Sequence, residues 1–90
     1  MAMAFPALRR TRLGSLFSEG SRLLRQVIEG RRWSMNEAAR QVDATTGMLA
    51  QWLFGDRRPG LEWAIKLRDL LGIPVDAWVQ PAQAPAEAAA

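Results

Sequence analysis

Apolar residues recur along most of the chain with the spacing of an α-helix, and no stretch alternates apolar and polar residues as a strand would. The first apolar stripe predicts a helix that begins near Ser18, a residue type favoured at helix N-caps. Gly14 and Gly20 weaken the helical pattern before and around that point, and Gly30 is expected to end the helix. The pattern as a whole predicts an all-α fold of five helices.

Two short helices are expected in the middle of the chain. The second helix is predicted near residues 34–42, with Ser34 as its N-cap and Glu37 three residues later completing a capping box. The third is predicted near residues 45–54, with Thr45 as its N-cap and Gly55 closing it. Their close succession leaves room for only a tight turn between them.

A fourth helix and a short fifth helix follow a loop of polar residues, proline and glycine. The fourth helix begins at Leu61 and is ended by Gly72, and the fifth covers Pro74 to Gln80. The last ten residues, 81–90, contain only Pro, Ala, Gln and one Glu, and this composition predicts a disordered tail. We therefore divide the chain into residues 1–17 as a basic N-terminal arm or helix extension, residues 18–80 as one helical domain, and the tail.

Composition narrows the chemistry available to the protein. Its 90 residues allow one core, and they include no cysteine and no histidine. Disulfides, thiolate chemistry, the common zinc sites and the usual catalytic triads are therefore excluded, and we expect no enzyme, no cofactor and no metal. No apolar run approaches the roughly 20 residues that span a membrane. We expect a cytoplasmic protein.

Basic residues are concentrated at the front of the chain. The net charge is +3, yet residues 1–32 carry seven arginines against two glutamates, while residues 33–80 carry five basic and six acidic residues. A basic arm suits a polyanion such as nucleic acid, and a solvated arm is the alternative.

The two central helices meet the requirements of a helix-turn-helix unit over residues 34–54. Ala38 and Ala39 are small enough for a close helix crossing. Asp43 stands where the turn requires a positive φ, which Asp tolerates better than most residues. The inner face of the third helix is apolar, with Leu49 and Trp52 followed by Leu53.

Residues 33–79 resemble the lambda-repressor/Cro-type (XRE) helix-turn-helix family. Thirteen positions match its pattern without a gap: Ser34, Glu37, Ala39, Thr45, Leu49, Trp52, Gly55, Pro59, Leu61, Leu67, Leu70, Gly72 and Asp76. Many members have Gln where this chain has Met35, and Gly at the turn where it has Asp43. The resemblance implies a repressor-like regulator of phage, plasmid or antitoxin type, with its third helix in the major groove of double-stranded DNA.

The resemblance also suggests which side chains meet DNA. The candidate base readers lie on the outer face of the third helix: Thr45, Thr46, Gly47, Ala50 and Gln51. Candidate phosphate contacts are Asn36, Arg57 and Arg58, and candidate arm contacts are Arg9, Arg10 and Arg12. The second hypothesis is a protein-interaction adaptor, favoured by the near-neutral charge of residues 33–80. A toxin or polymerase is a further possible partner.

One small domain presents a single recognition helix, so specific readout calls for a homodimer. The predicted contact is the last helix, with Val75 and Val79 on the core and Trp78 outward. In the alternative, Trp78 folds under Leu70 and Leu71 in a monomer.

Overall fold

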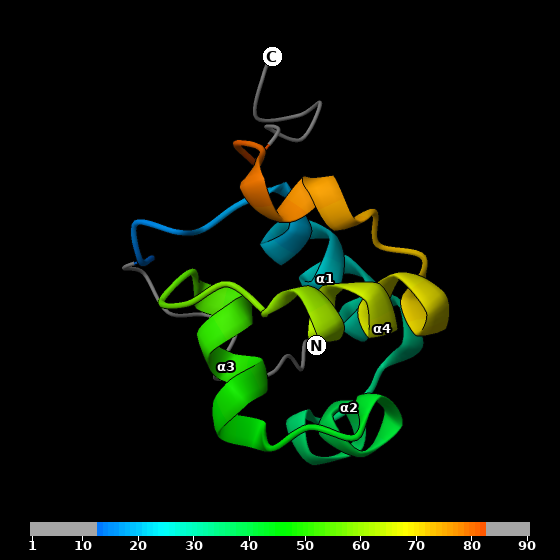
Figure 1. The fold of residues 1–90 in the computed structure, drawn as a ribbon. Coiled ribbons are helices and arrows are strands. Elements are labelled where there is room, and N and C mark those ends of the chain that lie inside the picture. The colour runs from blue at the N-terminus through cyan, green and yellow to red at the C-terminus, as the bar shows by residue number, and fades with distance from the viewer. Residues whose placement is uncertain (1–12, 83–90) are drawn as a thin grey trace.

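The computed structural model describes residues 13–82, which form a compact all-helical domain (Figure 1). Its elements are α1 (Glu19–Arg31), α2 (Met35–Val42), α3 (Thr46–Phe54), α4 (Leu61–Leu71) and the 3₁₀ helix η2 (Val75–Val79). The all-α prediction is confirmed, with four α-helices and a 3₁₀ turn in place of five α-helices. No helix in residues 13–82 is long and apolar enough to cross a membrane.

Side-chain caps fix where the first three helices begin. The predicted N-caps Ser18, Ser34 and Thr45 each accept a hydrogen bond from the backbone N–H three residues ahead, over 3.3, 3.0 and 3.0 Å. Each cap satisfies one of the N–H groups that the first turn of a helix leaves unpaired.

The helix ends are set by residues in the left-handed region. Gly55 and Gly72 adopt φ of 80° and 76°, as their sequence positions predicted, and Asp43 adopts 61°. The prediction that Gly30 ends α1 is wrong. The helix continues to Arg31, and Arg32 takes the left-handed conformation at φ 57°, with its N–H bonded to carbonyls of the last turn.

The last element is wound differently from the prediction, and this reverses its orientation. A 3₁₀ helix has three residues per turn, so Val75 and Trp78 lie on one side, whereas an α-helix would align Val75 with Val79. Trp78 is accordingly 3% exposed and Val79 is 65% exposed. The indole packs against Gly20, where a Cβ would come within 2.3 Å of the ring. The outward Trp78 was therefore a wrong prediction. The ring is turned inward, as the alternative prediction had it, and its contact with Gly20 lies on α1.

The core lies where all five elements meet. Its buried apolar residues are Leu24, Ile28, Ala38, Ala39, Val42, Leu49, Trp52, Leu53, Phe54, Ala64, Leu67, Ile73, Ala77 and Trp78. Helix α1 contacts both η2 and α3, while α2 contacts α3 and α4. On α4, only Ala64 and Leu67 are fully buried, and Leu61 and Ile65 face solvent. The core thus holds α3 between α1 and α2.

Candidate nucleic-acid interface

The α2–α3 unit is joined by a very short connection. Asp43 ends α2 with a positive φ, its N–H bonded to carbonyls of the last turn, and Thr45 already caps α3. The N–H of Ala44 also bonds to the carbonyl of Ala39 over 2.9 Å. Lys66 of α4 adds a surface ion pair with the Asp43 carboxylate at 3.4 Å. The turn therefore holds the two helices in a fixed relation.

The outer face of the N-terminal half of α3 is open to solvent. Thr45, Thr46 and Gly47 are exposed. Thr45 Oγ1 accepts the N–H of Met48, yet a hydroxyl keeps a donor and a second lone pair, so it can still bind a phosphate oxygen. A Cβ built on Gly47 would meet only Thr45 Oγ1, at 3.9 Å. This end of the helix can therefore approach a large partner closely.

Ala50 and Gln51 lie one turn further along and are half-buried. The side chain of Gln51 makes no hydrogen bond within residues 13–82, so its amide can both donate and accept. Its backbone carbonyl is occupied, because it accepts the N–H groups of Gly55, Asp56 and Arg57. The five predicted base readers therefore line one end of α3, and their exposure decreases toward its middle.

The last turn of α3 is buried on every side. Trp52, Leu53 and Phe54 are all at most 4% exposed. Residues 13–17, which we call the N-terminal strap, run beside the end of the helix (Figure 1). The N–H of Gly14 bonds to the carbonyl of Phe54 over 2.7 Å, and the N–H of Leu16 bonds to that of Gly55 over 2.8 Å. These bonds satisfy carbonyls that a helix end leaves unpaired.

Two glycines permit the strap to lie so close. A Cβ on Gly14 would come within 2.3 Å of the Gly55 carbonyl oxygen, and a Cβ on Gly55 would come within 2.1 Å of the Phe17 nitrogen. Arg25 of α1 completes the junction, with its guanidinium 5.6 Å from the ring centre of Phe17 and 5.9 Å from that of Phe54. The sequence did not indicate the contact of Gly14 with Gly55 or that of Arg25 with Phe54, because each joins segments far apart in the chain.

Ser21 ties α1 to the same end of α3. Its hydroxyl is buried and donates to the carbonyl of Trp52 over 2.7 Å. The aromatic ring of Trp52 packs on the other side against Trp63 of α4, with ring centroids 5.3 Å apart. The C-terminal half of α3 is therefore attached to the strap, α1 and α4.

Several cations are free to meet an anionic partner. Arg57 and Arg58 are exposed in the loop after α3, where the N–H of Arg57 bonds to the Gln51 carbonyl. Neither forms an ion pair within the described residues. Arg22 differs, because its guanidinium binds Glu19 over 2.9 Å, and this hydrogen bond raises the pKa of Arg22. The loop arginines therefore keep their charge available.

Helix α2 contributes a pair that the sequence analysis only half identified. Asn36 is exposed in its first turn, and Arg40 is exposed four residues later. Residues with this spacing share one face of a helix, so Arg40 stands beside Asn36. The spacing of a polar residue and an arginine on the outer face of α2 was the available signal.

The remaining predicted contacts are those of the N-terminal arm and of the last helix. Arg9, Arg10 and Arg12 lie outside the described residues. Of the predicted dimer contacts, Val79 is exposed and Val75 is half-buried, while Trp78 is inaccessible. The structure thus places the predicted base readers on the exposed side of α3 and the loop arginines just after it, while Trp78 is too buried to make the predicted dimer contact.

Within residues 13–82, no group of three or more carboxylate, histidine or cysteine side chains could hold a metal ion. Comparisons with protein-family models, curated proteins and solved structures give no match, so the chain is described by its fold alone, a small compact domain of four helices.

Proposed function

We propose that this protein is a sequence-specific DNA-binding transcriptional regulator of the lambda-repressor/Cro type, which inserts the outer face of α3 into the major groove. The observation that carries the proposal is the contrast along α3. The outer face of its first turns is exposed and bears small side chains, while its last turn is buried in the domain. A major groove about 12 Å wide admits such a helix.

Base reading is assigned to Thr46 and Gln51. The Gln51 amide can make paired hydrogen bonds to the N6 and N7 edge of adenine, and Thr46 can bond to several base edges. Gly47 and Ala50 let the helix approach the bases closely, because neither has a long side chain.

Phosphate contacts are assigned to both flanks of α3. Helix α3 has nine residues, or roughly 13 Å, which is close to the width of the groove. Arg57 and Arg58 at its C-terminal end then stand beside one DNA strand. Thr45 and Asn36, near the N-termini of α3 and α2, stand beside the other. Phosphate contacts fix the position of the protein and do not read sequence.

The protein would act as a homodimer, since one copy of α3 contacts too few base pairs to select a site within a genome. A two-fold pair places two helices about one DNA turn, roughly 34 Å, apart. Binding at an operator would then block or recruit polymerase.

Selection of bound fragments from a random pool of double-stranded DNA tests the proposal. We expect an enriched motif with two-fold symmetry. A pool that stays unenriched at moderate salt would contradict sequence-specific binding. It would favour the second candidate, a protein-interaction adaptor, which the balance of five basic and six acidic residues in 33–80 supports.

A further inference from the structure

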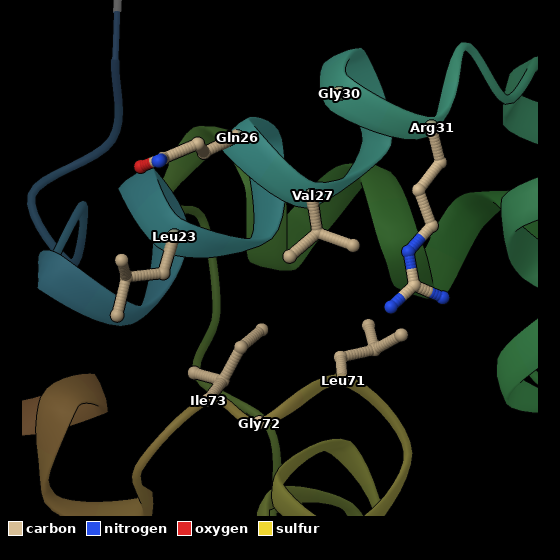
Figure 2. Close-up of a pocket in the computed structure, with 8 residues that line it drawn as sticks. All are labelled: Leu23, Gln26, Val27, Gly30, Arg31, Leu71, Gly72 and Ile73. Carbon is tan, nitrogen blue, oxygen red and sulfur yellow. The ribbon is translucent and has the colours of Figure 1, made fainter.

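An open groove lies between α1 and the C-terminal end of α4, and nothing in residues 13–82 fills it. Its volume is about 310 Å³. Figure 2 shows Leu23 and Val27 of α1 on one side, with Leu71 and Ile73 opposite. Gly30 also borders the groove, and a Cβ placed there would meet nothing within 4 Å.

The α1 side of this groove has a regular pattern. Leu23, Val27 and Arg31 follow one another at intervals of four residues, so they form one stripe of two apolar side chains and a cation. The stripe covers nine residues of helix, and its two ends lie about 12 Å apart. Arg31 forms no ion pair within the described residues and lies 5.0 Å from the ring centre of Trp33.

The outer face of α4 has the complementary pattern. Leu61, Ile65 and Asp69 have the same spacing, and they place two apolar side chains before a carboxylate. Leu61 is 69% and Ile65 is 37% exposed, both large apolar side chains left in water. Asp69 is also exposed, and its carboxylate pairs with the neighbouring Arg68 at 3.0 Å. Exposed ion pairs contribute little to stability, so Asp69 can readily pair with another cation instead.

We propose that the occupant of the groove is the outer face of α4 from a second copy of this chain. Aligned in parallel, the two stripes place Leu61 against Leu23, Ile65 against Val27 and Asp69 against Arg31. A two-fold pair repeats the contact, so both grooves and both α4 faces are covered. This contact supplies the dimer that the proposed function requires, with Trp78 remaining buried.

Two substitutions at accessible positions test the contact without disturbing the core. Ile65→Asp puts a charge into the apolar contact, and Gly30→Leu fills the groove. Sedimentation equilibrium at micromolar concentration, without DNA, should show a dimer for the wild type, and each variant should weaken association by about tenfold or more, as loss of a central apolar contact does. Gly30→Ala is the matched control and should associate like the wild type.

A charge exchange tests the register. Arg31→Asp or Asp69→Arg alone should weaken association several-fold, and the double variant should recover it, because the exchanged pair restores attraction. Arg32→Asp, next to the groove, should have less effect. A monomeric wild type, a dimer indifferent to Ile65→Asp and Gly30→Leu, a ladder of larger species, or a double variant without recovery would each overturn the proposal. Because these measurements omit DNA, they remain separate from the test of DNA binding.

Discussion

The two halves of α3 differ as much as the surface and the core of the domain, although they belong to one helix of nine residues. The first half begins at an exposed Thr45 and carries small side chains in solvent. The second half is buried, and its end is bonded to the strap and to Ser21. The comparison indicates how a small domain can use one helix for binding. Packing and hydrogen bonds hold its C-terminal end, while its N-terminal end stays accessible to a partner.

The fixed end also limits how the partner can approach. Since Phe54 is buried beside the strap and Arg25, the surface available for base contact is confined to the first turns of α3. A helix that is already held in place by the domain loses less conformational entropy on binding. The following experiments test whether the two halves differ in energy as they differ in structure.

The largest effect on stability is expected at Gly55, the C-cap of α3. Gly55→Ala would force a Cβ into the Phe17 backbone and hold alanine at φ 80°. Strain and overpacking together should lower the free energy of unfolding by about 2–6 kcal/mol. Gly47→Ala, the control in the open half, should raise it by up to about 1 kcal/mol. Urea denaturation of both variants measures the difference, and equal effects would contradict the contrast.

A smaller effect is expected where α1 holds the end of α3. Ser21→Ala removes the donor to the Trp52 carbonyl and leaves a buried acceptor unsatisfied. The cost should be about 1–3 kcal/mol in the free energy of unfolding. Ser15→Ala, at an exposed position of the strap, is the control and should change stability by less than about 0.5 kcal/mol. A neutral Ser21→Ala would mean that this bond does not anchor the helix.

The smallest effect on stability, with a clear effect on DNA binding, is expected at the loop arginines. Arg57→Ala should leave the melting temperature almost unchanged, because the side chain is exposed and unpaired within the described residues. The dependence of DNA affinity on salt should lose about one unit of slope. Arg22→Ala is the control, since Arg22 already binds Glu19. Identical slopes for the wild type and Arg57→Ala would remove Arg57 from the proposed interface.

The sequence predicted the local features of the fold well. The caps Ser18, Ser34 and Thr45 and the turn at Asp43 depend on residues a few positions apart, and the structure has each of them. Gly30 misled the prediction because Arg32 tolerates the left-handed conformation just beyond it. Helix boundaries that depend on neighbouring residues are therefore predictable from the sequence, although a residue such as Arg32 can shift an end by one or two positions.

Features that join distant segments were not predictable in this way. The strap reaches α3 across about 40 residues of chain, and neither Gly14 nor Arg25 carries a local signal of it. Trp78 was misplaced because its orientation depends on whether five residues wind as a 3₁₀ or an α-helix, and Gly20 provides the space for the ring. The positions of the base readers on α3 followed from helical spacing alone, whereas their role remains a proposal.

The most direct test of the central claim is the ratio of affinities for a selected DNA sequence and a scrambled one, measured by fluorescence anisotropy at moderate salt. We predict a ratio of about 10³ or more for the wild type. Gln51→Ala should lower it by about 1–3 kcal/mol in discrimination, while Arg57→Ala should weaken binding to both sequences alike. A wild-type ratio near one, or a ratio that Gln51→Ala leaves unchanged, would contradict base reading by the outer face of α3.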